Sequence, residues 1–203
     1  MDTRKAIGLG AAFVATAAVF FLIGRLTRPV EDWSRQYVNR AADPQEYDNP
    51  FHGVRLRAPA GGEWLLAWKP EDFRFPTPLA VNKVLEIERL LKRGDKTTPW
   101  ARMDLFVEAL SASRAVRGRL KVLEFREKRP GFHIVSEESA TVGGLAARVR
   151  TARWAVAGRR FASVNYYLVR GNRLFAFIGV CDAEALEQVK PLFDQIISSV
   201  RFE

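Results

Sequence analysis

The stretch that decides the fold is residues 145–181, LAARVRTARWAVAGRRFASVNYYLVRGNRLFAFIGVC. Three runs within it mix apolar and polar residues over lengths typical of strands. They are separated by Ala157-Gly158-Arg159 and Gly171-Asn172, where glycine supplies the backbone freedom that a tight turn needs. The pattern predicts antiparallel strands joined by hairpins. The three runs are 145–156, 160–170 and 173–181.

One segment before this stretch is ambiguous. Residues Val84–Leu91 fit either a strand or a helix by the spacing of their apolar side chains. We favour a strand, because Gly94-Asp95 then turns the chain into the alternating run Arg102–Ala109. The other predicted strands are 54–58, 63–68 and 132–139.

Two helices complete the predicted fold. Ser111 or Ser113 can cap a helix that runs to about Phe125, and Asp182 can cap a last helix that ends near Ser198. Apolar residues recur at helical spacing in both segments. Antiparallel strands with helices laid on them form an α+β sandwich. The predicted fold class is therefore α+β, an antiparallel β-sheet flanked by two main helices.

The N-terminus predicts a membrane anchor. Ala6 to Gly24 is an uncharged run bounded by Lys5 and Arg25. As a helix it would extend about 28 Å, close to the hydrocarbon thickness of a bilayer. A cleaved signal peptide is the alternative, but cutting after Ala15-Thr16-Ala17 would leave an apolar segment on the mature protein. No cysteine follows the run, which excludes a lipoprotein anchor. We expect an uncleaved transmembrane helix within residues 1–28.

The orientation of this anchor is left open by the charges around it. Basic residues on its two sides nearly balance, with a slight tilt toward a cytoplasmic domain. A short basic N-terminus before an apolar run is typical of an export signal, and we favour a domain on the extracytoplasmic side, the bacterial periplasm. Gly8, Ala12 and Thr16 form a small-residue ridge through which two copies of the helix could associate.

Residues 29–50 are polar, mixed in charge and end in Asp-Asn-Pro, which indicates a juxtamembrane linker. The globular domain is expected to start at Phe51 and to span 51–203. Its opening strand, Gly53–Pro59 with Gly61-Gly62-Glu63-Trp64 after it, resembles the Mog1/PsbP-like fold. Two further segments resemble parts of that fold: Val142–Ala147 before the long hairpins, and the C-terminal segment Leu186–Phe202. The resemblance implies an α+β sandwich and a binding or assembly-assisting role, and it implies no catalytic motif.

The net charge and the cysteine content limit which classes of function and of site the chain can have. The net charge is +9 and the charges are interspersed, so attraction to nucleic acid or anionic lipid is permitted but not required. The single cysteine, Cys181, excludes an internal disulfide framework and a cysteine-rich zinc site. It shares a strand face with Phe175 and Phe177, which indicates a buried apolar residue rather than a catalytic thiol.

No pattern in the sequence indicates catalysis or a cofactor. His52 and His133 are far apart and lack neighbouring ligand types, so no metal site is expected. Asp43, Glu46 and Asp48 form an acidic cluster without the glycine and spacing of a calcium loop. No glycine pair has the context of a phosphate loop. The sequence therefore predicts a protein that is not an enzyme and holds no cofactor.

The candidate contact residues are basic and aromatic. Four form a basic stripe on the first predicted helix, and two occupy a hairpin tip. The seventh is a tryptophan in a loop, a candidate for an exposed anchor. They are Arg114, Arg117, Lys121, Lys128, Arg159, Arg160 and Trp100.

Two hypotheses follow for function. In the first, the chain is a membrane-anchored, non-catalytic module that recruits a protein partner through its sheet or hairpin tips. In the second, it binds or hydrolyses a small ligand in an aromatic pocket lined by Trp64, Trp68 or Tyr166-Tyr167. A deep pocket with convergent polar groups would favour the second, and a filled core with an exposed patch the first.

Overall fold

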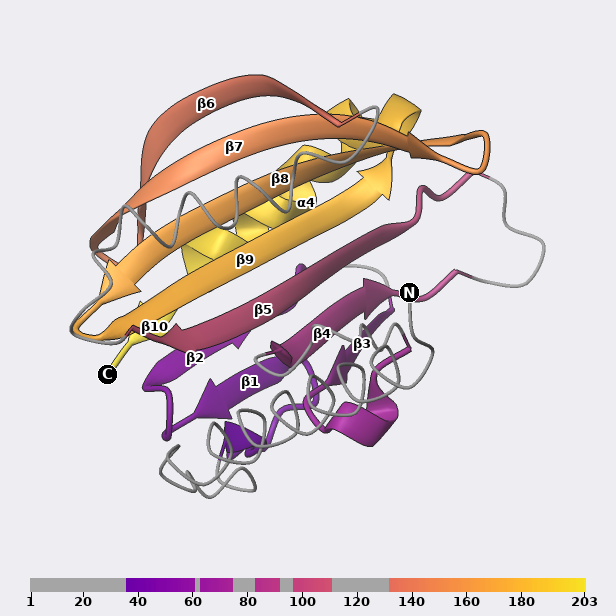
Figure 1. Ribbon diagram of the computed structural model, residues 1–203. Helices are drawn as coiled ribbons and strands as arrows, with labels where there is room; N and C mark the ends of the chain where they lie inside the picture. The colour runs from indigo at the N-terminus through magenta and orange to yellow at the C-terminus, as the bar shows by residue number, and fades with distance from the viewer. Residues whose placement is uncertain (1–35, 61–62, 75–82, 92–96, 111–131) are drawn as a thin grey trace, which may run out of the picture. The chain divides into compact units, whose positions relative to one another are not determined.

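The structure is a computed structural model that describes residues 36–60, 63–74, 83–91, 97–110 and 132–203 (Figure 1). The chain divides into two compact units, Met1–Ser34 and Arg35–Glu203, and the described residues belong to the second. Among them, no helix combines the length and the hydropathy that a bilayer crossing requires. The anchor predicted at residues 6–24 lies outside the described residues.

A seven-stranded antiparallel sheet forms the body of the second unit (Figure 1). The strand order is β3-β4-β5-β9-β8-β7-β6, so three strands separate β5 and β6, which are successive along the chain. The strands expected around 145–181 and at 84–91 are confirmed. The strands are β3 (Trp64–Ala67), β4 (Lys83–Arg89), β5 (Ala101–Ala109), β6 (His133–Val142), β7 (Leu145–Val156), β8 (Arg159–Arg170) and β9 (Arg173–Asp182).

A second, three-stranded sheet has the order β1-β2-β10, formed by β1 (Glu46–Asn49), β2 (Val54–Arg57) and β10 (Arg201–Phe202). Strand β1 lies in the segment that the sequence assigned to a linker, and the compact unit already begins at Arg35. In the structure, residues 46–49 thus contribute a strand to the second sheet. The polar composition of 29–50 concealed this strand, because only alternate residues of β1, Tyr47 and Asn49, are buried.

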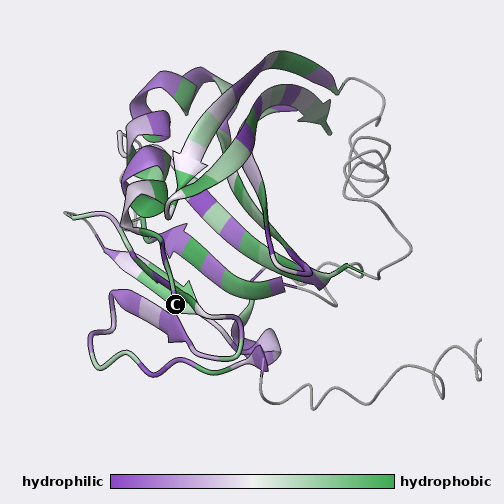
Figure 2. Cartoon of the chain, turned by 90° about the vertical axis from the view of Figure 1, so that its left-hand side faces the viewer, coloured by the Kyte–Doolittle hydropathy of each residue, from purple (hydrophilic) through white to green (hydrophobic). Residues whose placement is uncertain are grey.

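One helix, α4 (Leu186–Ser199), packs on one face of the seven-stranded sheet, which we call the helix face. Figure 2 shows its apolar stripe turned toward the strands. Gly179 of β9 lies under Phe193, where an added Cβ would stand 2.7 Å from the ring. Close packing of the helix on β9 therefore depends on this glycine. The buried residues of α4 are Leu186, Val189, Phe193, Ile196 and Ile197.

The prediction of a sheet flanked by two main helices is wrong. In the described ranges α4 is the single α-helix, accompanied by two 3₁₀ turns, η1 (Pro70–Asp72) and η3 (Ala183–Ala185). The first predicted helix, from Ser111 or Ser113 to about Phe125, lies outside those ranges. The last helix also begins later than expected. Asp182 makes no side-chain cap, and its carboxylate binds Arg159 at 3.0 Å instead.

Candidate binding surface

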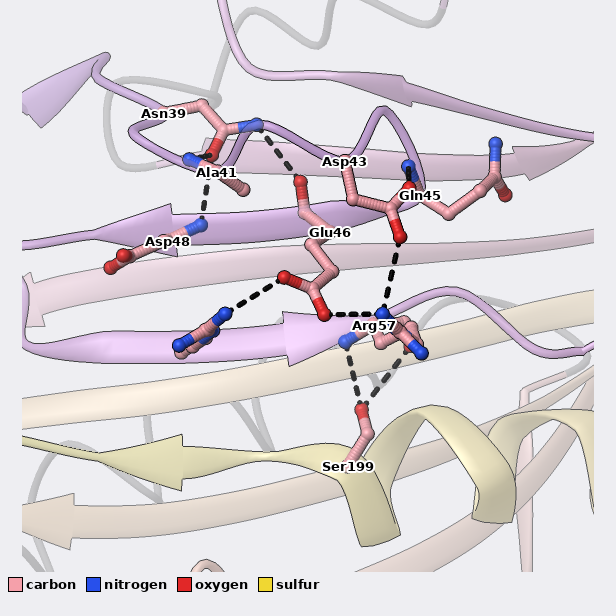
Figure 3. A network of polar contacts seen from close by, with 9 residues as sticks. Asn39, Ala41, Asp43, Gln45, Glu46, Asp48, Arg57 and Ser199 are labelled. Atoms are coloured by element: carbon pink, nitrogen blue, oxygen red, sulfur yellow. Dashed lines mark hydrogen bonds and ion pairs between the residues drawn. The ribbon is translucent and has the colours of Figure 1, made fainter.

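The acidic cluster of residues 43–48 is engaged by arginines (Figure 3). Arg57 Nη2 lies 3.1 Å from Asp43 Oδ2 and 2.6 Å from Glu46 Oε1, and Arg55 reaches Glu46 Oε2 at 2.9 Å. Ser199 Oγ accepts a hydrogen bond from the Arg57 backbone N–H at 2.9 Å, which connects β2 to the end of α4. These contacts join the elements of the small sheet and α4.

The thiol and one imidazole of the chain are buried. Burial raises the pKa of the Cys181 thiol to about 12, with Asp182 contributing, so a thiolate is disfavoured there. Burial, with a smaller effect of the Arg173 charge, lowers the pKa of His52 to about 4. His133 lies at the exposed start of β6. No group of metal-ligating side chains occurs within the described ranges of the chain.

A buried charge network crosses β4 and β5 on the face opposite α4, which we call the second face. Lys83, 1% exposed, binds the Glu86 carboxylate and lies 2.9 Å from Asp104 Oδ1. Arg102 approaches Asp104 Oδ2 at 3.4 Å. Burial raises the pKa of Asp104, while the nearby Arg102 and Lys83 charges act in the opposite direction. Because its charges are mutually paired, this network supports the sheet rather than offering a reactive group.

Trp100 belongs to the same network. Its indole Nε1 donates a hydrogen bond to Glu88 Oε1 at 3.0 Å, and the Arg102 guanidinium lies 5.7 Å from its ring centre. Arg74 reaches the other Glu88 oxygen at 3.2 Å. The tryptophan proposed as an exposed anchor is thus half-buried and held by a carboxylate.

This network was not predicted from the sequence. Glu86 and Asp104 alternate with apolar residues and therefore resemble solvent-facing positions, yet the ladder places them directly opposite each other. Glu88 and Arg102, which are ladder partners of opposite charge, and Lys83, whose charge compensates the like-charged Glu86 and Asp104, are the signal that could have revealed it.

Arg159 and Arg160 lie at the start of β8, as predicted, and both are paired with acids. Arg159 reaches Asp182 at 3.0 Å and also lies 5.2 Å from the centre of the Phe161 ring. Arg160 forms an ion pair with Glu184. The other predicted basic contacts, Arg114, Arg117, Lys121 and Lys128, lie outside the described residues.

Three aromatic rings extend across the sheet beside these arginines. Trp154 stacks between Phe132 and Phe161, with ring centres 6.0 and 5.8 Å apart. All three rings are half-buried. Their stacking across β7 and β8 places a strip of apolar surface at this end of the sheet.

Exposed apolar residues gather at the same end. Of the four large apolar side chains exposed in the described part of the chain, three belong here: Ile134 (49% exposed), Val135 (51%) and Val156 (53%). The fourth, Leu91, follows β4. We call the end formed by Ile134, Val135, Val156 and the three stacked rings the apolar end.

A groove of about 430 Å³ adjoins the apolar end, between the strands and the start of α4. His133 and Arg153 line it and face each other as partners in the β6–β7 ladder. Neither side chain has a hydrogen bond or an ion pair within the described ranges. Glu187 lines the groove as well. The groove therefore presents charged groups that are open to a binding partner.

In the described part of the chain, the aromatic side chains of the second hypothesis do not line one common pocket. Trp64 is 4% exposed and Tyr166 is 3% exposed, and both belong to the core. The Tyr166 hydroxyl donates to Asp194 Oδ1 at 2.7 Å. Tyr167 lines a separate cavity of about 520 Å³ with Arg148 and Glu137, and neither this cavity nor the groove is lined by Trp64, Trp68 or Tyr166.

No family model and no curated protein sequence matches the chain. Several solved structures resemble it in fold, among them the following two. Cyanobacterial PsbP (CyanoP) from Synechocystis sp. PCC 6803 has a TM-score of 0.57 at 14% identity, covering 82% of this chain and 97% of that one. LpqN, involved in cell envelope biogenesis of Mycobacterium tuberculosis, has a TM-score of 0.55 at 16% identity, covering 81% and 87%. The expected PsbP-like fold is confirmed.

Proposed function

We propose that this chain is a membrane-anchored, non-catalytic binding or assembly-assisting protein, whose PsbP-like domain recruits a protein partner on the extracytoplasmic side. The observation that carries the proposal is the apolar end. Three of the four large apolar side chains exposed in the described ranges gather there, beside the strip of stacked rings. Contiguous exposed apolar surface with a polar border is typical of protein interaction sites.

The surroundings of the apolar end also fit a protein partner. Arg159 and Arg160 are neutralised by Asp182 and Glu184, so the border is mixed in charge rather than strongly basic. A surface that binds anionic lipid or nucleic acid usually presents an excess of cations. A mixed polar border around apolar residues is more typical of a protein interface.

The environments of the candidate reactive groups support a non-catalytic role. The Cys181 thiol is buried with a raised pKa, and the Lys83 ammonium is occupied by two carboxylates. A nucleophile or a general base needs access to a substrate and a matched pKa. Neither group has that access.

The membrane location rests on the sequence of residues 6–24, and the extracytoplasmic side is supported by one structural neighbour. LpqN, of similar fold, is involved in cell envelope biogenesis. Reporter fusions at the C-terminus of the full chain, active on only one side of the membrane, test the orientation. A reporter active only in the cytoplasm would overturn this part of the proposal.

Recruitment is tested by affinity capture from detergent-solubilised membranes. The full chain and a chain without residues 1–28 are compared, and bound proteins are quantified by mass spectrometry. We expect one stoichiometric partner with the full chain, weakened by Ile134→Asp and unaffected by Leu91→Asp. The absence of any stable partner with either chain would contradict recruitment.

A further inference from the structure

We propose that the outer edge of β6 is the docking edge, and that an extended segment of the partner protein adds to it as a further strand. This inference rests on the proposed function and states how the partner is held. In strand addition, main-chain hydrogen bonds supply affinity and alternate side chains supply specificity. The segment we infer carries an apolar residue beside Ile134 and Val135 and a basic residue near Glu138.

Strand β6 is an open edge. It is last in the strand order and pairs with β7, and no other described strand pairs with it. Figure 1 shows it as the outermost strand of the sheet. It is ten residues long, whereas β3 at the opposite edge has four. An edge strand presents a row of unpaired backbone N–H and C=O groups, so β6 offers a long template for pairing.

The side chains of β6 are unusually exposed for a strand. All positions from His133 to Ser139 are exposed. Ile134 and Val135 are about half exposed, although β-branched apolar residues favour contact with a neighbouring strand. A register shift in the β6–β7 ladder between Ile134 and Ser136 marks a bulge at Val135. Covering these side chains would remove apolar surface from water.

The charges in the middle of β6 indicate which kind of partner segment can add to this edge. Both carboxylate oxygens of Glu137 are already paired. Arg150 donates two hydrogen bonds to Oε2, from Nε at 2.9 Å and from Nη2 at 2.7 Å, and Arg148 binds the other oxygen. The adjacent Glu138 points to the opposite face and has no ion-pair partner within the described ranges. A lysine or arginine on an added strand would complement this carboxylate.

A second copy of this chain fits the edge poorly. If two β6 strands paired antiparallel about a two-fold axis, opposite residues would have to point to the same face of the sheet. A pairing near the centre of the strand would therefore place Glu137 opposite Glu137, or Glu138 opposite Glu138, of the other copy. Like charges in directly opposite positions destabilise a sheet. The edge therefore favours a different protein with a basic residue at that position.

The inference can be tested with two synthetic peptides. Each is acetylated and ten residues long, with valine and threonine alternating, and one central residue is lysine in the first peptide and glutamate in the second. Both are titrated into the full chain in detergent, followed by fluorescence anisotropy. We expect the lysine peptide to bind at least ~10-fold more tightly, and Glu138→Lys to reverse the preference. Ile134→Asp should weaken both peptides by at least ~10-fold.

Matched controls separate the edge from general effects of charge and hydropathy. Glu71→Lys makes the same charge change in the exposed turn η1, and Leu91→Asp removes the large exposed apolar residue that the described ranges hold outside the apolar end. Both should leave peptide binding unchanged. Slowed amide hydrogen exchange confined to 133–142 on peptide binding would support strand addition. Equal binding of the two peptides, or none at millimolar concentration, would overturn the inference.

The outcomes distinguish this inference from the function that it deepens. If a partner is captured equally by wild type, Ile134→Asp and Glu138→Lys, recruitment stands and the edge inference fails. If the lysine peptide binds as expected but no partner is ever captured, recruitment fails. A dimer in sedimentation velocity that Ile134→Asp dissociates would assign the edge to a second copy and overturn the inferred partner.

Discussion

Lys83 is a fully buried ammonium held between the Glu86 and Asp104 carboxylates on the second face. Its nitrogen also lies 4.8 Å from the centre of the Phe73 ring. A buried ion pair contributes little net stability when complete, but removing one partner leaves the remaining charges without compensation. The position therefore tolerates few substitutions, although nothing in its local sequence marks it as buried.

We predict that Lys83→Met lowers the free energy of unfolding by about 3–5 kcal/mol, because two carboxylates lose their buried cation. Urea unfolding of the purified chain at neutral pH measures the change. The control is Lys190→Met, which removes a half-exposed i,i+4 pair with Asp194 and should cost less than about 0.5 kcal/mol. Equal effects of the two variants would show that the Lys83 network is not buried in solution.

His52 should make stability depend on pH. Its pKa is lowered to about 4 in the folded chain, below the ordinary value of 6.5, because burial disfavours the imidazolium. Between about pH 4 and pH 6.5 the unfolded chain binds more protons than the folded chain. The free energy of unfolding therefore decreases as the pH falls through this range, by up to about 3 kcal/mol. Urea unfolding at pH 7 and pH 4.5 should show a smaller difference for His52→Gln than for wild type. An identical difference in both proteins would contradict the assignment.

At the scale of elements, the β7–β8 hairpin combines a favourable turn with one strained residue. Val156 and Arg159 are ladder partners, so Ala157 and Gly158 form a two-residue loop. Both have positive φ, 49° and 78°. Two positive φ values are required by the type I′ turn, which matches strand twist and favours Asn-Gly. Alanine is disfavoured in this conformation because its Cβ crowds the backbone.

We therefore predict that Ala157→Asn raises the free energy of unfolding by about 0.5–1 kcal/mol, since asparagine tolerates the left-handed conformation. Thermal unfolding of the purified chain provides the measurement. Ala155→Asn, an exposed change two residues earlier in the strand, should not stabilise the protein. A loss of stability in Ala157→Asn would indicate that the turn has another geometry.

At the scale of the whole molecule, the two sheets share one core through the N-terminal part of the domain. Tyr47 of β1 is fully buried, and its hydroxyl donates to the Val84 carbonyl of β4 at 3.2 Å. Asn49, also fully buried, donates to the Tyr47 hydroxyl at 2.7 Å and to the Gln36 carbonyl at 2.7 Å. These contacts make residues 36–49 part of the domain.

A chain that begins at Arg35 should therefore fold, whereas a chain that begins at Phe51 should not. The shorter chain loses β1 and the buried Tyr47 side chain. This loss lowers the free energy of unfolding by about 3–5 kcal/mol or more, which is of similar order to the total stability of a domain. Circular dichroism and the cooperativity of thermal unfolding compare the two. A cooperative transition at the same temperature in both chains would place the domain boundary at Phe51 after all.

The sequence by itself determined the strands of the 145–181 stretch, their turns and the last helix, because alternation, turn glycines and helical spacing act over a few residues. It also placed Arg159 and Arg160 at a hairpin tip. Only the tertiary structure decided that β1 joins a second sheet and that Glu86 lies opposite Asp104 in a buried network. The same holds for the open edge of β6. These features depend on which strands become neighbours, and that choice follows from burying one common core rather than from any local pattern.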